Sequence, residues 1–167
     1  DLELTPRLTG WFGDAAPFEF REQPTPHPDV RRRFLGGTTA VAPMYHAVEG
    51  ARILLDHGLE AVRAHSLALT SVALERADAA DLSLRSPRPP EARSAMVVLE
   101  VPEAEKLSAH LKDHGIYTDS RRNAVLRMAP FLWNTEAEVH RTFDRIEAAL
   151  DSGAYRRQSV SSGGPVT

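Results

Sequence analysis

One arginine in an otherwise apolar stretch is the first residue whose chemistry can be anticipated. Arg127 begins the segment Arg127-Met128-Ala129-Pro130 and follows the apolar residues Val125-Leu126. A guanidinium presents a planar fork of donors that matches a carboxylate, and it stays charged at any relevant pH. An enzyme of amino acids can therefore hold its substrate through one such side chain. On the residues alone, the alternative is an edge-strand arginine that pairs with a surface acid.

A second group of residues has the donors that an anion requires. Trp11 lies in Gly10-Trp11-Phe12-Gly13, and Thr38 ends Arg33-Phe34-Leu35-Gly36-Gly37-Thr38. An indole N–H donates without a competing acceptor, and a hydroxyl beside two glycines lets backbone N–H groups approach an anion. We expect Trp11 and Thr38 to bind a phosphate. The alternatives are a buried anchor for Trp11 and a simple turn at the two glycines.

The other reactive residue types predict no site. The chain has no cysteine, which excludes disulfides, thiolate metal sites and cysteine nucleophiles. His110 and His114 have the spacing of paired metal ligands, but no glutamate follows His110 and no third ligand is evident. A solvated helix face is therefore favoured over a metal site. The two lysines, Lys106 and Lys112, fall in a polar helical stretch far from the motifs.

Composition gives no sign of a nucleic-acid or membrane partner. The 167 residues are 42% hydrophobic and 26% charged, with a formal net charge of −3. No excess of either sign points to nucleic acid or an anionic membrane, and no apolar run approaches spanning length. We expect neither kind of partner. Without a signal pattern at the start of the sequence, we expect a cytoplasmic protein.

Three segments are expected along the chain. Residues 1–41 are rich in proline, glycine and aromatics without a sustained period, and should form an extended arm that carries cofactor and partner contacts. Residues 42–151 should form an α/β domain, and the Ser- and Gly-rich residues 152–167 a disordered tail. Within the domain, periodicity predicts helices from 42 to a cap at Gly58 and at 59–78, 103–114 and 134–150, and strands at 95–101, 116–118 and 124–128.

This order of elements predicts the fold class. Two helices followed by β-α-β-β-α are typical of a small α/β sandwich, in which helices cover one face of a mostly antiparallel sheet. The last helix has the clearest start, because Thr135 and Glu138 have capping-box spacing.

Taken in order, the three motifs resemble the C-terminal half of kynureninase and related class V aminotransferase-like enzymes, which depend on pyridoxal 5'-phosphate. The resemblance covers roughly residues 8–150. It implies the small C-terminal domain of fold-type I pyridoxal enzymes, with the preceding segment crossing between subunits. It also implies that Arg127 binds the substrate α-carboxylate, and that Trp11 and Thr38 reach the cofactor phosphate of the neighbouring subunit.

Three departures from the kynureninase pattern bear on the substrate. Asp14 stands where His is common, Thr39-Ala40 replaces Pro-Pro, and Trp133 replaces Tyr. These changes keep the cofactor class and put cleavage of kynurenine itself in question.

The resemblance also implies a companion chain. Enzymes of this type hold the cofactor covalently through a lysine in another domain, which these residues do not resemble. We expect the smaller subunit, or the C-terminal half, of a pyridoxal 5'-phosphate-dependent enzyme that transaminates an amino acid or cleaves it at the β-carbon. The isolated chain should be inactive. The alternative is a non-catalytic regulatory or binding module that retains the small-domain fold.

Overall fold

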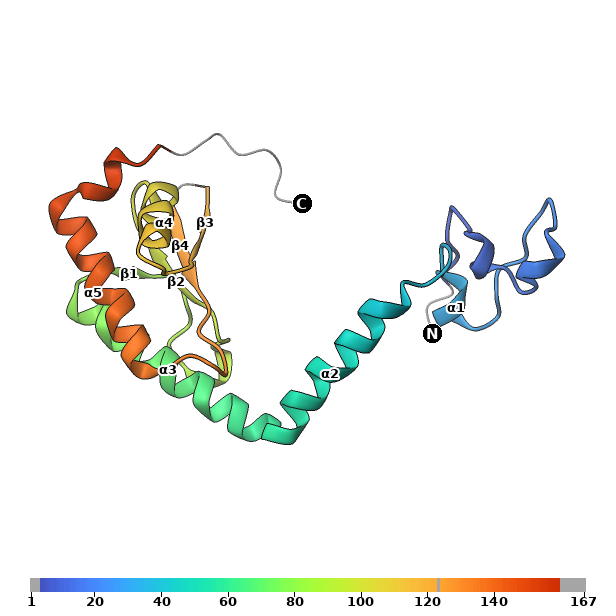
Figure 1. The fold of residues 1–167 in the computed structure, drawn as a ribbon, viewed down its shortest axis with the longest axis horizontal. Coiled ribbons are helices and arrows are strands. Elements are labelled where there is room, and N and C mark those ends of the chain that lie inside the picture. The colour runs from blue at the N-terminus through green and yellow to red at the C-terminus, as the bar shows by residue number, and fades with distance from the viewer. Residues whose placement is uncertain (1–3, 123, 160–167) are drawn as a thin grey trace. The chain divides into compact units, whose positions relative to one another are not determined.

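The computed structural model describes residues 4–122 and 124–159 (Figure 1). The chain divides into two compact units, Asp1–Ile53 and Leu54–Thr167. Helix α2, Val41–His57, has residues in both units. The boundary expected from the sequence, between residues 41 and 42, stays a prediction.

Short helical turns and backbone hydrogen bonds between loops organise the first unit. The amide of Ala15 donates to the carbonyl oxygen of Thr25, and the amide of His27 to that of Gly13, each over 2.8 Å. These bonds satisfy backbone groups that a free loop would expose. The segment expected as an extended arm is therefore held together by hydrogen bonds between its own loops. Its elements before α2 are the 3₁₀ turns Trp11–Gly13 and Pro17–Glu19 and the helix α1, Val30–Arg33.

Two long helices follow, and one glycine separates them. Helix α2 ends at His57, and α3 spans Leu59–Ala79. Gly58 between them has a φ of 83°, which residues with a side chain rarely adopt. The helix end predicted at Gly58 is confirmed.

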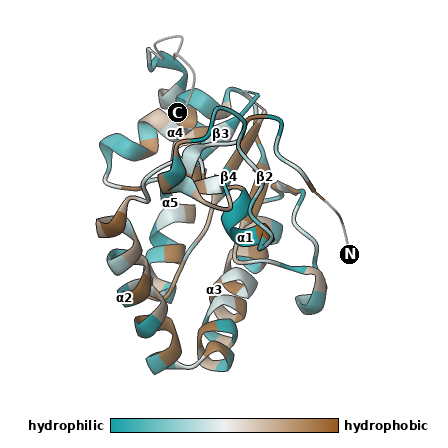
Figure 2. Cartoon of the chain, turned by 90° about the vertical axis from the view of Figure 1, so that its right-hand side faces the viewer, coloured by the Kyte–Doolittle hydropathy of each residue, from teal (hydrophilic) through white to brown (hydrophobic). Residues whose placement is uncertain are grey.

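Helix α2 carries an apolar stripe that the described residues leave uncovered. Val41, Met44, Tyr45 and Val48 recur at spacings of three and four, which places them on one side of the helix. Each of these residues is 47 to 71% exposed. Hydrophobic residues can be followed along this helix in Figure 2. In α3, by contrast, a whole face is buried, and its buried apolar residues are Leu69, Ala73, Leu74 and Ala77.

Four short antiparallel strands form the sheet of the second unit. They are β1 (Ser83–Leu84), β2 (Val97–Glu100), β3 (Asp119–Arg121) and β4 (Val125–Met128), in the spatial order β1-β2-β4-β3. Strands β2 and β4 lie where the sequence predicts them. Strand β1 was not predicted, because two residues carry no periodicity. The strand expected at 116–118 begins at 119 instead, because Ile116 packs into the core just after the preceding helix has ended at Asp113.

Alternate strand residues give the sheet a covered face and an open face. Leu99 of β2 pairs with Leu126 of β4, and both are completely buried. Val98 pairs with Arg127, and successive side chains of a strand point to opposite faces. Val98 and Arg127 therefore share the open face.

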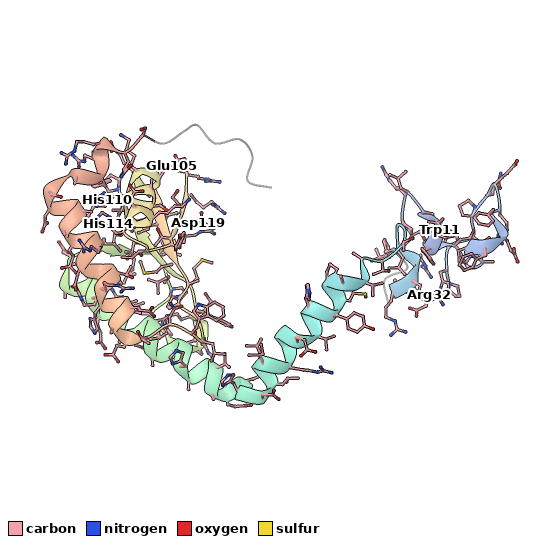
Figure 3. All side chains as sticks on the ribbon, in the orientation of Figure 1. Trp11, Arg32, Glu105, His110, His114 and Asp119 are labelled. Carbon is pink, nitrogen blue, oxygen red and sulfur yellow. The ribbon has the colours of Figure 1, made fainter. Side chains whose placement is uncertain are left out.

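Three helices pack on the covered face (Figure 1). They are α3, α4 (Ala104–Asp113) and α5 (Glu136–Ser152), and Figure 3 marks His110 on α4. Helix α5 begins with the predicted capping box, since Thr135 Oγ1 accepts from the amide of Glu138 and the Glu138 carboxylate accepts from the amide of Thr135. The predicted fold class, helices on one face of an antiparallel sheet, is confirmed. The core residues that α4 and α5 contribute include Leu107, Leu111, Val139, Phe143 and Ile146.

The segment after α5 is partly folded. Residues 154–157 form a 3₁₀ helix in which Tyr155 is 1% exposed, and its hydroxyl donates to the carbonyl oxygen of Pro102 at 3.4 Å. Burial of this ring explains why order extends beyond residue 152, where the sequence predicted disorder. Residues 160–167, the rest of the expected tail, lie outside the described residues. Within the part of the chain that the structure describes, no helix is long and apolar enough to cross a membrane.

Candidate functional site

Arg127 lies on an interior strand and projects from the open face of the sheet. Strand β4 runs between β2 and β3, and Arg127 pairs with Val98 on one side and Asp119 on the other. Its side chain is 28% exposed. The edge-strand position considered from the sequence is wrong, because β3 adds a further strand beyond β4.

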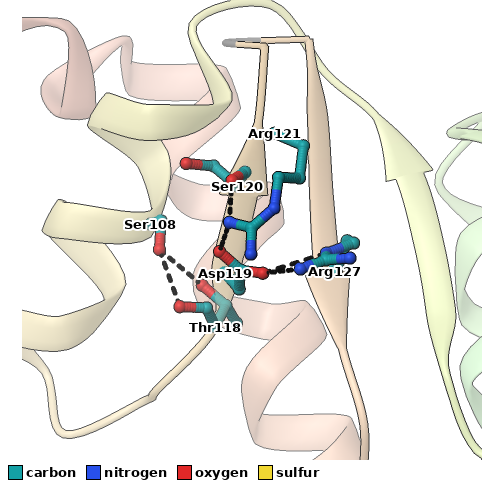
Figure 4. A network of polar contacts seen from close by, with 6 residues as sticks. All are labelled: Ser108, Thr118, Asp119, Ser120, Arg121 and Arg127. Carbon is teal, nitrogen blue, oxygen red and sulfur yellow. Dashed lines mark hydrogen bonds and ion pairs between the residues drawn. The ribbon is translucent and has the colours of Figure 1, made fainter. Parts of the chain in front are cut away.

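One carboxylate holds this guanidinium (Figure 4). Oδ2 of Asp119 accepts from Nε of Arg127 at 2.9 Å and also from Nη2. Arg121 donates from Nη1 to the other oxygen, Oδ1, at 2.5 Å. Burial alone would raise the pKa of Asp119, but the hydrogen bond and charge of Arg127 and the charge of Arg121 hold the pKa below its ordinary value. Asp119 is therefore anionic at neutral pH.

The acid partner leaves part of the Arg127 guanidinium free. Both contacts with Asp119 use the Nε and Nη2 side of the fork, and within the described residues Nη1 has no partner. A guanidinium can bind a second carboxylate through the end formed by its two η nitrogens. Pairing with an acid and binding a substrate carboxylate are thus compatible. The carboxylate role of Arg127 stays a prediction.

A hollow of about 330 Å³ lies on the opposite side of the sheet from Arg127. The three residues that follow Arg127 in the motif line it, together with residues of α3 and α5. Because Met128 points toward the helices and Arg127 away from them, this hollow is separate from the guanidinium. The residues of the motif that line the hollow are Met128, Ala129 and Pro130.

In the first unit, two motifs that are far apart in the sequence pack together through glycines. A Cβ added to Gly10 would overlap the backbone of Gly36, and one added to Gly13 would lie 2.6 Å from the carbonyl oxygen of Arg33. Only glycine allows two backbones to approach so closely. The structure thus brings Gly10-Trp11-Phe12-Gly13 against the segment that carries Gly36-Gly37-Thr38.

Trp11 and Thr38 present unused donors beside this contact. A Cβ at Gly37 would lie 3.9 Å from the indole nitrogen of Trp11, so the ring nitrogen borders the glycine next to Thr38. Within the described residues, neither the indole N–H nor the Thr38 hydroxyl has a hydrogen-bond partner. Trp11 is 41% exposed and contacts Phe12, Phe18 and Phe20. It is therefore not the buried anchor considered from the sequence, and its phosphate role stays a prediction.

Asp14, where the sequence departs from the kynureninase pattern, is a structural residue of the first unit. It is 5% exposed, accepts from the amide of Ala16 at 3.0 Å and forms an ion pair with Arg21. Both contacts are made by Oδ1, so this oxygen is occupied within the chain. The Arg33 side chain also has partners within this unit, since it donates to the carbonyl oxygens of His27 and Leu4, each at 2.8 Å.

Acidification is expected to loosen this unit. The amide of Ala16, followed by the Arg21 side chain, lowers the pKa of Asp14, and the side chain and amide of Arg31 lower the pKa of Asp29 to about 2. A lowered folded-state pKa gives stability that is present above the unfolded value of 3.8 and lost as the pH falls through the folded value. In a Trp133→Phe background, Trp11 emission should shift toward that of the unfolded chain between about pH 4 and pH 2.

An Asp14→Asn variant serves as the control for this titration. It removes the Asp14 contribution, so the unit should be weaker at neutral pH and its response to acid smaller. Emission from Trp11 that stays constant over the whole range would contradict the role of these carboxylates.

The lysines and paired histidines belong to α4 and its C-terminal cap, on the opposite face of the sheet from Arg127. Lys106 pairs with Glu103 at 3.3 Å, and Lys112 is exposed on the same helix, α4, which covers the helical face of the sheet. The ring centroids of His110 and His114 lie 4.7 Å apart with the rings tilted by 44° (Figure 3), and burial followed by the charge of His114 lowers the pKa of His110. Among the described residues, no cluster of three or more potential ligands could hold a metal ion.

The segment that carries Arg127 is similar to a known protein family. The sequence pattern of the kynureninase C-terminal domain matches residues 62–146, which include β2, β4 and Arg127. The chain belongs to this family. A kynureninase from Burkholderia mallei (strain SAVP1) is 29% identical over 165 residues, which make up 96% of this chain and 39% of that enzyme. One from Deinococcus radiodurans is 32% identical over 149 residues, 86% of this chain and 36% of the enzyme.

Solved structures share the fold of this kynureninase C-terminal domain. A cysteine desulfurase from Thermococcus onnurineus NA1 superposes with a TM-score of 0.68 at 20% identity, over 78% of this chain and 35% of that one. A NifS-like protein gives a TM-score of 0.62 at 21% identity, over 74% and 37%. The small-domain fold of fold-type I pyridoxal enzymes, predicted from the resemblance, is confirmed. The chain spans about two fifths of the length of the kynureninases that it matches.

Asp119 is the site residue that sequence reasoning missed. The signal was present, because Asp119 and Arg121 flank one residue and would share a face in a strand. The strand was expected three residues too early, at 116–118, so this alternation was not recognised.

Proposed function

We propose that this chain is the smaller subunit, or the C-terminal half, of a kynureninase-like enzyme that depends on pyridoxal 5'-phosphate and acts on an amino acid. A companion chain, or a further part of a longer chain, carries the lysine that holds the cofactor. The single observation that carries the proposal is Arg127, fixed by Asp119 on the open face of a kynureninase C-terminal domain.

The donors of the first unit fit the phosphate end of the cofactor. The indole N–H of Trp11 and the hydroxyl of Thr38 are unpaired within the described residues, and a Cβ at Gly36 would meet nothing within 4 Å. A phosphate needs this combination of free donors and bare backbone. The remaining requirement, a lysine, is not met here, because both lysines belong to α4.

Each residue has a defined task in the proposed enzyme. Arg127 binds the α-carboxylate of the amino acid through its η nitrogens, which fixes the direction of the bonds at the α-carbon. Trp11 and Thr38 hold the phosphate and so position the ring. When bound, pyridoxal 5'-phosphate withdraws electrons from a bond at the α-carbon. The chemistry supported is transamination or cleavage at the β-carbon.

The buried carboxylate of Asp14 argues for a substrate other than kynurenine. Kynureninases commonly carry a histidine here, whereas Asp14 is committed to Arg21 and the amide of Ala16. Asp14 is also 5% exposed, which leaves little room for a substrate group at its carboxylate. We therefore favour an amino acid whose side chain does not need a hydrogen-bonding partner at position 14.

Exposed apolar residues supply a surface for the companion. The stripe of α2 is continuous over Val41, Met44, Tyr45 and Val48, and Phe18 and Phe20 are 70% and 78% exposed. Exposed aromatic and aliphatic side chains of this kind are typical of an interface. The alternative, a regulatory module, would also need a partner but not a free donor set beside bare glycines.

Co-purification from the native host, followed by an absorbance scan, tests this proposal. We expect the chain to bring with it a lysine-bearing polypeptide, and the pair to be yellow from bound cofactor. The separated chain should be colourless and inactive. A stable partner that binds no cofactor would contradict the enzyme and favour the regulatory module.

A further inference from the structure

We propose that Asp119 is a positioning residue, which holds the Nε and Nη2 side of Arg127 and thereby turns the Nη1 and Nη2 end toward the substrate carboxylate. This inference rests on the proposed function. It goes beyond it by assigning a role to a residue of β3 that never touches the substrate.

Cross-strand geometry is the first argument. Asp119 stands directly opposite Arg127 in the antiparallel pair of β3 and β4, where side chains on one face are neighbours. A single oxygen, Oδ2, receives both Nε and Nη2. This side-on arrangement fixes the plane of the guanidinium and leaves its far end free, whereas an unrestrained arginine would sample many rotamers.

Charge balance is the second argument. An isolated pair of Asp119 and Arg127 would be neutral and would attract a further anion weakly. Arg121 binds the other oxygen of Asp119 at 2.5 Å, so two guanidinium groups and one carboxylate leave one net positive charge. Glu100, another acid of the open face, is already paired with Arg85. An incoming carboxylate therefore meets a positive site.

The support of β3 is the third argument. Ser108 on α4 donates to the carbonyl oxygen of Thr118 at 2.9 Å, and the Thr118 hydroxyl donates back to Ser108 at 3.1 Å (Figure 4). These bonds tie the residue before Asp119 to a helix of the covered face. The carboxylate that orients Arg127 is thus carried by an anchored strand, as a positioning residue requires.

Binding of L-alanine and of ethylamine separates this role from a structural one. Both probes carry the amine, but ethylamine lacks the carboxylate. In the reconstituted, cofactor-loaded enzyme, followed through the visible absorbance of the cofactor, Asp119→Asn should weaken L-alanine binding about tenfold, the value of one charge-assisted hydrogen bond. Ethylamine binding should stay within about twofold, because only the carboxylate contact is affected.

Three further variants make the outcome decisive. Asp119→Glu should recover part of the loss, and Glu100→Gln, which removes an acid of the same face, should not weaken L-alanine binding. Unchanged L-alanine binding in Asp119→Asn would overturn the positioning role. Tighter binding would also overturn it, because it would show that Asp119 competes with the substrate for Arg127. If Arg127→Ala also left L-alanine binding unchanged, or the wild type did not bind it, the proposed function itself would fail.

Exchange of the Arg127 Nε hydrogen, measured by NMR on the chain alone, gives a readout that needs no cofactor. In the wild type this hydrogen should exchange more slowly than that of Arg88, whose contacts with Asp78 use only its η nitrogens, and the Asp119→Asn variant should remove most of the difference. Equal exchange in the wild type and the variant would show that Asp119 does not hold the guanidinium in solution.

Discussion

Replacing Arg127 with alanine should lower kcat/KM of the reconstituted enzyme by about 100- to 1,000-fold. The substitution removes a two-pronged, charge-assisted contact with the substrate carboxylate, and hydrogen bonds to charged groups contribute about 1.5 to 3 kcal/mol each. It also leaves Asp119 without its main partner, so the local charge changes from positive to neutral. Steady-state kinetics on the purified pair measure the effect.

Two controls separate loss of chemistry from loss of structure. Arg127→Lys keeps the charge but not the planar fork, and should recover only part of the activity. Arg88→Ala removes an exposed guanidinium that pairs with Asp78 of α3 and should leave kcat/KM unchanged. If Arg127→Ala had the kinetics of the wild type, the chain would be better described as a regulatory or binding module.

Replacing Gly10 with alanine should disrupt the first unit and, with it, the phosphate-binding arrangement. The new methyl group would overlap the backbone of Gly36, which cannot move aside as a flexible side chain could. Overpacking of this kind costs about 3 kcal/mol at the upper end of its usual range. In a Trp133→Phe background, Trp11 emission should shift toward that of the unfolded chain, and cofactor retention by the pair should fall by about 100-fold.

Gly36→Ala is the matched control for this prediction. The two glycines face each other, yet a Cβ at Gly36 would meet nothing within 4 Å. The variant should therefore keep the Trp11 emission of the wild type. Equal behaviour of the two variants would contradict the close approach of the two motifs.

The helices of this protein follow from local sequence signals. The glycine at position 58, the capping box at Thr135 and Glu138 and the apolar stripe of α5 act within one or two turns of helix, so their effects can be anticipated without knowing the fold. Strand β2, with its run of valine and leucine, is a similar case. Together they were enough for the fold class.

The short strand β1 and the start of strand β3 could not be predicted from the sequence. Strand β1 has two residues and exists only because β2 offers a partner. Strand β3 begins at Asp119 because Ile116 is buried in the core. This burial depends on helices that come from other parts of the chain. Local patterns cannot encode such competition.

The sequence by itself determined the family, the fold class and Arg127 as the residue to examine, because motif order and periodicity are properties of the chain. Only the tertiary structure decided that Asp119 holds Arg127, that Gly10 touches Gly36 and that the apolar stripe of α2 stays exposed. Each of these depends on which residues meet across strands or loops. These contacts result from tertiary packing, which brings together residues that are distant in the sequence.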